Sequence, residues 1–323
     1  MNKRYLITAM GGDIGDSVVC CLNREYGKSH LAGCDITPFV PGYDQVENFF
    51  LVPPFVEEDR YIKSILEKCA QYKITHVLPM TEGEIKVFDR KREVFSQAGI
   101  GLMIHNSRIL DVALSKCKTA KAVEKMGLYS PKTWSRNVDF TELRYPVMVK
   151  PDCGCGSTGV CVAGNVRECQ DAVSSIQDAV IQEYVGTSHD EYTVGIFSSG
   201  KTVVSIAFRR TLQHGMSRVV EYVKDEKIQE IAKTVADYFV LKGSLNIQMR
   251  KQNGEYYIFD INPRISSTVG FRYEMGFKDL IWWLELMDHD ETDISYIPEE
   301  LPVIGIRTYR EKLFRTRFPD AEL

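Results

Sequence analysis

The fold is decided by the stretch Tyr256-Tyr257-Ile258-Phe259-Asp260-Ile261-Asn262-Pro263-Arg264, together with the run 244–250 that precedes it. Apolar residues alternate with other residues in both runs, which is the pattern of half-buried β-strands. The pair Asn253-Gly254 between them is a strong hairpin signal. We therefore expect a β-hairpin that ends where Pro263 stops the second strand.

The register of this hairpin depends on which residues must share a face. A two-residue turn at Asn253-Gly254 would set Gln248 opposite Phe259 and mix polar and apolar residues on each face. A three-residue loop with a left-handed Gly254 sets Gln248 opposite Ile258, so we expect that loop. The predicted core face then carries Leu245, Ile247, Met249, Tyr257, Phe259 and Ile261.

The other face of the predicted hairpin carries Asn246, Gln248, Asp260 and Asn262. These are oxygen ligands with one formal charge, a set that Mg²⁺ uses when phosphates supply the remaining ligands. Arg264 follows directly and is a planar donor suited to phosphate or carboxylate. For the hairpin alone, an ordinary edge hairpin with a solvated polar face is an equally good interpretation.

Composition excludes several classes of protein. The length of 323 residues suggests about two domains, and the net charge of −4 gives no reason to expect a nucleic-acid or membrane-surface partner. No run approaches the roughly 20 apolar residues of a membrane helix. Nine scattered cysteines do not form a disulfide framework, so we expect a cytoplasmic protein.

The N-terminal third alternates strands with helices, which predicts a small doubly wound parallel sheet ending near residue 105. Gly11 and Gly12 follow the first strand, but the spacing is not the dinucleotide-binding fingerprint. Glu82 and Glu84 follow a later strand, where a substrate could be bound. We prefer to interpret these two residues as solvated acids of a loop and not as substrate ligands.

A lysine followed by a glycine-rich loop forms a second candidate binding feature, in the middle of the chain. Lys150 ends a buried strand and is followed by the loop Gly154-Cys155-Gly156-Ser157-Thr158-Gly159. Backbone N–H groups of such loops cradle phosphates, although no Walker A lysine follows this one. Taken alone, the two features favour a flexible turn beside an exposed lysine.

The order of motifs resembles the ATP-grasp superfamily over nearly the whole chain, and within it one half of the carbamoyl-phosphate synthase large subunit. The motifs are Ser115-Lys116-x-x-Thr119, Val149-Lys150-Pro151, Gln182-Glu183-Tyr184-Val185, Asn246-Ile247-Gln248 and Asp260-Ile261-Asn262-Pro263-Arg264. The resemblance implies an α/β protein whose ATP-grasp fold, two α+β subdomains clasping ATP, spans residues 106–312. A pre-ATP-grasp α/β domain would span residues 1–105, and a C-terminal tail residues 313–323.

The resemblance also implies roles for individual residues. Lys116 and Lys150 would hold the phosphates of ATP, while Glu183 and Glu191 would meet the adenine amino and ribose hydroxyl groups. The backbone of residues 182–185 would bind adenine. Further nucleotide contacts would come from Gly156, Ser157, Thr158, Gly159, Gln182, Tyr184 and Val185.

Metal and substrate residues follow from the same resemblance. Gln248, Asp260 and Asn262 would hold Mg²⁺ or Mn²⁺. Arg264 would stabilise an acyl phosphate, and either Arg209 or Arg218 would bind a substrate carboxylate or the γ-phosphate. Asp260 stands where most of the family has glutamate, which shortens the reach to the metal.

The implied activity is that of an ATP-dependent ligase that joins a small-molecule carboxylate to an amine through an acyl phosphate. A small-molecule kinase, a partial enzyme similar to carbamoyl-phosphate synthase and an ATP-binding module remain alternatives. A complete synthase is not expected, because the sequence shows a single ATP-grasp unit. The substrates and the oligomeric state stay open, a homodimer included.

Overall fold

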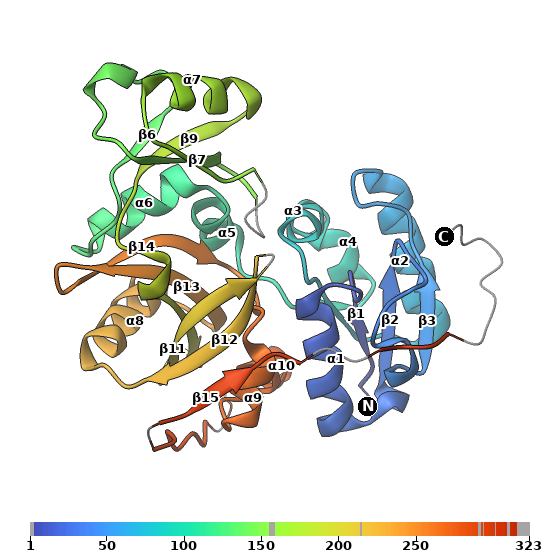
Figure 1. Cartoon of the computed structure of the whole chain (residues 1–323). Helices are drawn as coiled ribbons and strands as arrows, with labels where there is room; N and C mark the ends of the chain where they lie inside the picture. The colour runs from blue at the N-terminus through green and yellow to red at the C-terminus, as the bar shows by residue number, and fades with distance from the viewer. Residues whose placement is uncertain are drawn as a thin grey trace. The chain divides into compact units, whose positions relative to one another are not determined.

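The computed structural model describes residues 3–154, 159–213, 215–289, 292, 294–300, 302–308 and 311–314. The chain divides into two compact units (Figure 1). The first unit consists of Met1–Asn106, Arg264–Ser295 and Thr308–Leu323, and the second of Ser107–Pro263 and Tyr296–Arg307. Within the described ranges, every helix is too short or too polar to cross a bilayer.

The first unit contains a parallel five-stranded sheet in the order β3-β2-β1-β4-β5, as the alternating sequence pattern predicts. Its strands are β1 (Tyr5–Ile7), β2 (Leu31–Asp35), β3 (Asn48–Leu51), β4 (His76–Leu78) and β5 (Gly101–Leu102). Its helices are α1 (Asp13–Tyr26), α2 (Glu58–Tyr72), α3 (Glu82–Arg90), α4 (Arg92–Gln97), α9 (Val269–Glu274) and α10 (Asp279–Asp288).

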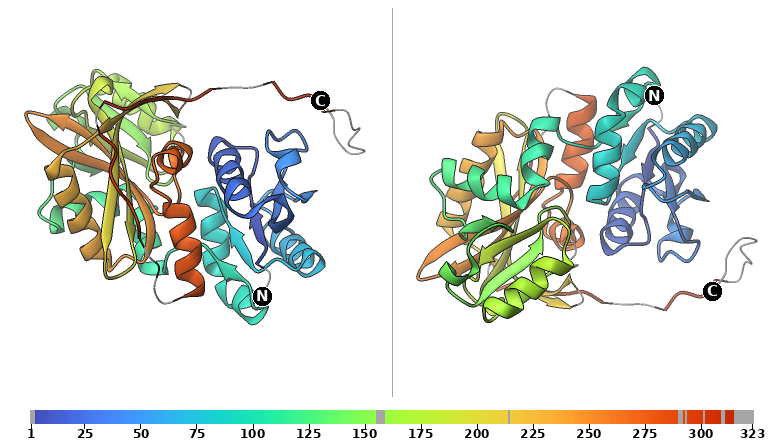
Figure 2. Two further views of the ribbon diagram at one scale, coloured as in Figure 1. Left: turned by 90° about the horizontal axis from the view of Figure 1, so that it is seen from below. Right: turned by 90° about the horizontal axis from the view of Figure 1, so that it is seen from above.

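The second unit contains a six-stranded antiparallel sheet in the order β14-β13-β10-β11-β12-β15. Its strands are β10 (Glu191–Ser198), β11 (Val203–Gln213), β12 (Met216–Val223), β13 (Gly243–Gln252), β14 (Glu255–Asn262) and β15 (Ile304–Ile306). The helices beside it are α5 (Ser107–Ala113), α6 (Lys116–Lys125) and α8 (Glu226–Phe239). Apolar residues of these helices pack on one face of the sheet, and α8 runs along it (Figure 2).

A four-stranded antiparallel sheet completes the second unit, in the order β6-β9-β7-β8. Its elements are β6 (Thr133–Ser135), β7 (Val147–Pro151), β8 (Cys161–Ala163), β9 (Ala179–Glu183) and the helix α7 (Val166–Ser175). Cys169 and Val173 of α7 pack on Val147, Val149 and Ile181 of the sheet. The helix begins after Asn165, whose side chain caps it by accepting a hydrogen bond from the Glu168 N–H.

The central hairpin is present, but the predicted register is wrong. Asn253 and Gly254 both have positive φ, 52° and 82°, and form a two-residue turn between the paired residues Gln252 and Glu255. The extra residue lies within β14 instead of in the loop. Gln248 pairs with Asp260 and Met249 with Ile258, so Phe259 is a β-bulge.

The bulge changes which residues of β14 reach the core. Tyr256 and Ile258 pack in the core with Ile261, whereas Tyr257 and Phe259, which we expected there, are only partly buried. Leu245, Ile247 and Met249 of β13 lie in the core as predicted. Beyond the bulge, Gln248 pairs with Asp260 and Asn246 with Asn262. These pairs differ from the predicted ones, but the four side chains share one face as predicted.

The two-residue turn requires a left-handed conformation at position 253, which the predicted loop does not. Replacing Asn253 by alanine should therefore lower the free energy of unfolding by about 1 kcal/mol. The left-handed region is unfavourable for residues with a Cβ, and asparagine tolerates it better than alanine because its side chain can form local hydrogen bonds. Asn253→Gly should have little effect. Chemical denaturation of both variants checks this, and equal stability of the alanine and glycine variants would contradict the observed register.

Candidate nucleotide site

One face of the six-stranded sheet, opposite the face packed by α8, is lined by polar side chains. This polar face is defined here as Glu191, Thr193, Asn246, Gln248, Asp260 and Asn262. Strand pairing sets Thr193 opposite Gln248 and Gln248 opposite Asp260. The Asn262 amide donates to Asp260 Oδ2 over 3.3 Å, and Thr193 Oγ1 donates to Asn246 Oδ1 over 2.9 Å.

The polar face fits a divalent cation that takes part of its shell from elsewhere. It brings the three predicted ligands, Gln248, Asp260 and Asn262, to neighbouring positions on paired strands. In the part of the chain that the structure describes, no three His, Cys, Asp or Glu side chains are grouped for a metal. One carboxylate and two amides suit Mg²⁺ when phosphate oxygens complete the coordination.

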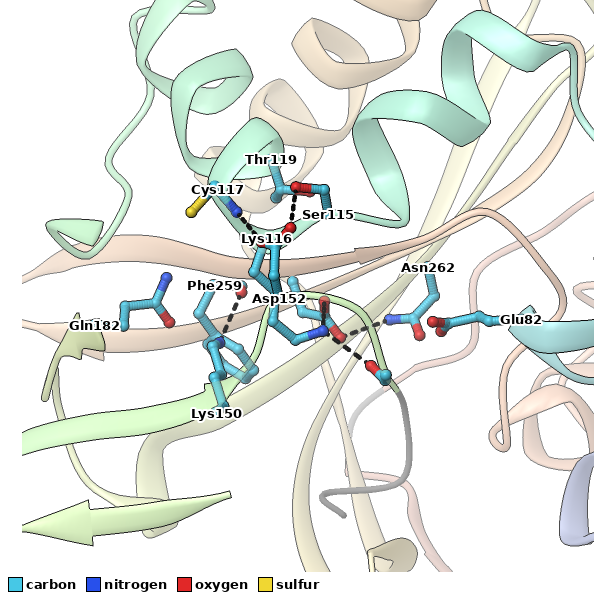
Figure 3. Close-up of polar contacts among 12 residues, drawn as sticks. Glu82, Ser115, Lys116, Cys117, Thr119, Lys150, Asp152, Gln182, Phe259 and Asn262 are labelled. Atoms are coloured by element: carbon cyan, nitrogen blue, oxygen red, sulfur yellow. Dashed lines mark hydrogen bonds and ion pairs between the residues drawn. The ribbon is translucent and has the colours of Figure 1, made fainter. Parts of the chain in front are cut away.

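Lys150 ends β7 and is buried, with 5% of its surface exposed. Its Nζ donates to the Phe259 carbonyl over 3.4 Å and lies 5.5 Å from the centre of the Phe259 ring (Figure 3). No carboxylate of the described residues forms an ion pair with it. Burial therefore lowers the pKa of Lys150 from 10.5 to about 8, although the charge of Asp260 opposes the shift. The interpretation of Lys150 as an exposed lysine is wrong.

Lys116 begins α6 and lies beside the carboxylate of Asp260. Its Nζ donates to the Gly154 carbonyl over 2.9 Å and is 3.9 Å from Asp260 Oδ1. Asp152 fixes the start of α6, since it accepts hydrogen bonds from Ser115 Oγ and the Cys117 N–H at 2.7 and 2.9 Å (Figure 3). The structure thus brings together a lysine from each of two distant motifs and the predicted metal ligand.

The glycine-rich loop is described at its two ends. Gly154 has φ 152° and Gly159 has φ 71°, and both values favour glycine. The predicted phosphate ligands Gly156, Ser157 and Thr158 lie outside the described residues. Because Lys116 contacts the Gly154 carbonyl, the start of the loop lies beside the predicted phosphate lysine.

The predicted adenine segment lies at the end of β9. Gln182 is buried and donates to Thr133 Oγ1 over 2.9 Å. Glu183 forms two contacts with Lys132, through its own N–H at 2.8 Å and through its carboxylate at 3.2 Å. The Tyr184 ring centre lies 5.4 Å from the Arg250 guanidinium. The nucleotide contacts expected of this segment, including those of the buried Val185, stay predictions.

The arginines of β11 lie on opposite faces of the sheet. Arg209 is paired with Tyr192 on the face packed by α8, and its side chain forms an exposed ion pair with Glu221. Arg210 is buried on the polar face and lies 2.9 Å from Glu191.

The structure therefore brings Arg210 to the polar face, where the sequence-based hypothesis named Arg209 or Arg218. Adjacent strand residues point to opposite faces, so only the pairing of Tyr192 with Arg209 distinguishes these candidates. Arg218 lies in β12, where its carbonyl accepts a hydrogen bond from the Arg307 N–H. A substrate contact by Arg209 or Arg218 stays a prediction.

Arg264 lies in the first unit, in the loop between β14 and α9. Its Nη2 donates to Glu82 Oε1 over 3.3 Å. The loop is held by the fully buried Arg272, which donates to Ser266 Oγ and Thr268 Oγ1, each at 2.7 Å. The role of Arg264 at an acyl phosphate stays a prediction.

The interpretation of Glu82 and Glu84 as solvated acids is wrong. Both lie in the first turn of α3 and are at least nine-tenths buried. Glu84 accepts hydrogen bonds from Tyr61 Oη at 2.7 Å and Thr81 Oγ1 at 2.9 Å, and its burial raises its pKa. Tyr61 is distant in sequence, but Thr81 forms a capping box with Glu84, and the Thr-x-x-Glu spacing of such a box is visible in the sequence.

Two family models match this chain. Residues 6–103 match the PylC-like N-terminal domain, and residues 113–268 match the ATP-grasp domain. The N-terminal match covers the five-stranded parallel sheet, and the ATP-grasp match covers the four-stranded sheet and most of the six-stranded sheet. The chain therefore contains an ATP-grasp domain preceded by a PylC-like N-terminal domain.

Individual relatives are distant. The carbamoyl phosphate synthase large chain of Sulfurisphaera tokodaii is 23% identical over 242 residues, which cover 68% of this chain and 23% of that protein. The chain thus spans about a quarter of the length of this relative.

Solved structures share the fold. The L-amino acid ligase from Bacillus licheniformis is similar with a TM-score of 0.70 and 17% identity, over 90% of this chain and 74% of that chain. The biotin carboxylase domain dimer of Hydrogenobacter thermophilus 2-oxoglutarate carboxylase, solved with MgADP, ADP and bicarbonate, has a TM-score of 0.71 and 13% identity. It covers 91% of this chain and 71% of that one.

The buried charge of Lys150 should destabilise the protein in the absence of ligand. Its pKa is 10.5 when unfolded and about 8 when folded, so the unfolded state binds more protons between these values. The penalty is therefore complete below pH 8 and disappears above pH 10.5. Lys150→Met should stabilise the protein at pH 7, by at most about 3 kcal/mol.

Thermal unfolding from pH 7 to 10.5 measures this difference. The advantage of Lys150→Met should shrink steadily as the pH rises. Lys118→Met is the matched control, because Lys118 is an exposed lysine paired with Asp111. A stability difference for Lys150→Met that does not change with pH would contradict the buried-charge assignment.

Proposed function

We propose that the protein is an ATP-dependent ligase that joins a small-molecule carboxylate to an amine. The observation that carries this proposal is the buried ammonium of Lys150, which has no ion-pair partner among the described residues. A buried cation without a counter-charge is unfavourable, and a phosphate group supplies that charge when it binds. Lys116 and Asp260 lie beside this position, which suits a nucleotide–metal complex.

The chain's own residues would hold ATP and Mg²⁺ as follows. Lys116 and Lys150 bind phosphate oxygens through charge-assisted hydrogen bonds. Gln248, Asp260 and Asn262 hold Mg²⁺ or Mn²⁺, with phosphate oxygens as the remaining ligands. The bound cation neutralises charge on the transferring phosphoryl group. The MgADP bound to the similar biotin carboxylase domain supports this choice of ligands.

The reaction balances in two steps. An oxygen of the carboxylate attacks the γ-phosphorus of ATP, the bond to the bridging oxygen breaks, and ADP leaves. The amine nitrogen then attacks the carbonyl carbon of the acyl phosphate, and phosphate leaves with one carboxylate oxygen while the amine loses a proton. A kinase would stop after the first step, because it needs no amine. The likeness to an L-amino acid ligase supports the two-step reaction of a ligase.

Isotope transfer tests this reaction directly. Carboxylates are screened with a pool of amino acids for ADP release, and the best carboxylate is then prepared with ¹⁸O. We expect ADP formation that needs both acceptors, an amide product, and ¹⁸O in the released phosphate. Label that stays in a phosphorylated product formed without an amine would identify a kinase and contradict the ligase.

Asp260→Asn is the companion variant for this assay, since it keeps the side-chain shape and removes the charge. Its turnover should fall by roughly a hundredfold, the scale of losing an electrostatic contact in the transition state. Glu221→Gln removes an exposed carboxylate from the other face of the same sheet, and it should retain wild-type turnover. Wild-type turnover in Asp260→Asn would contradict a catalytic role for the negative charge of Asp260.

A further inference from the structure

A buried cluster of three charges lies at the far end of the polar face from Asn262. Glu191 on β10 sits between Arg210 on β11 and Arg250 on β13. Its Oε1 accepts from Arg210 Nε and Nη2 at 3.3 and 2.9 Å, and its Oε2 accepts from Arg250 Nε and Nη2 at 3.1 and 3.0 Å. Both oxygens of the carboxylate are thus engaged side-on by guanidinium groups.

The cluster carries two positive charges and one negative charge. The exposed fractions of the side chains are 6% for Glu191, 6% for Arg210 and 15% for Arg250. A net charge in such a position is unfavourable unless another charge compensates it. The cluster therefore favours an anion as an additional partner, and it leaves little capacity on Glu191 to accept further hydrogen bonds.

The two arginines differ in the donors that remain. Arg210 uses Nε and Nη2 on Glu191, and its Nη1 donates to the buried Ser217 Oγ over 3.4 Å. Arg250 Nη1 has no hydrogen-bond partner among the residues that the structure describes. Of these two arginines, Arg250 therefore has one nitrogen, Nη1, whose N–H donors are available to a ligand.

The surroundings of Arg250 indicate which ligand that is. Its guanidinium lies 5.4 Å from the centre of the Tyr184 ring and 5.8 Å from that of Phe259. The Phe259 carbonyl accepts from Lys150, and the same ring lies under the Lys150 ammonium. Arg250 thus shares Phe259 with the lysine proposed to bind phosphate.

We propose that Arg250 is a further phosphate ligand of the nucleotide, and that Glu191 and Arg210 are positioning residues that hold its guanidinium in place. Glu191 then acts through Arg250 and does not bind the ribose hydroxyl groups. This inference rests on the proposed function, since it takes ATP as the ligand. A planar guanidinium fixed along one edge presents its other edge to an anion in a defined orientation.

The test separates phosphate contacts from sugar contacts. Dissociation constants for ATP, adenosine and 3′-deoxy-ATP are measured by calorimetry, with Mg²⁺, on the full chain. We expect Arg250→Met and Glu191→Gln each to weaken ATP binding by about tenfold, the effect of losing one charge-assisted hydrogen bond. Adenosine binding should stay unchanged, and the preference for ATP over 3′-deoxy-ATP should be the same in Glu191→Gln as in the wild type.

A structural defect would not imitate this result, because the ratio of two affinities does not depend on the folded fraction. Glu221→Gln, which removes an arginine-paired carboxylate from the opposite face, should bind all three ligands as the wild type does. If Glu191→Gln loses the preference for ATP over 3′-deoxy-ATP, Glu191 binds ribose and the inference fails. If the wild type binds no ATP, the proposed function fails instead, so the two failures are distinguishable.

Discussion

The site depends on one constraint: the ammonium of Lys150 is buried without a carboxylate ion pair among the described residues. Its stabilising contacts are the Phe259 carbonyl, the Phe259 ring and the nearby charge of Asp260. These contacts are weaker than a direct ion pair and do not offset the cost of burying the charge, so the pKa of Lys150 is lowered. Stability is thus reduced in the free protein at a position where binding of an anion would restore it.

The β-bulge at Phe259 links this charge to the fold. In a regular hairpin with the observed turn, Phe259 would face Gln248, whereas the bulge sets Asp260 there and leaves Phe259 unpaired. Phe259 then contacts Lys150 on one side and Arg250 on the other. A local irregularity of one strand therefore organises charges that come from three separate parts of the chain.

Much of the architecture could be predicted from the sequence, because it depends on local patterns. Alternating residues predicted β13 and β14, and the resemblance to the ATP-grasp superfamily, carried by the order of the lysine, glycine and Asp-x-Asn motifs, predicted the fold. The bulge at Phe259 could not be predicted, since the same turn residues allow either register. Arg210 was missed for a similar reason: its face depends on the pairing of β11 with β10. The burial of Glu82 depends on Arg264, which is far away in sequence.

Proton uptake on nucleotide binding tests the central claim most directly. At pH 8.5, a Lys150 with a pKa of about 8 is mostly neutral in the free protein, and a bound phosphate should return its pKa toward the usual value of a lysine. Calorimetric titration with ATP in buffers of different ionisation enthalpy should therefore show uptake of roughly 0.7 proton by the wild type. Lys150→Met should show none. ATP binding by the wild type without proton uptake at this pH would contradict the account.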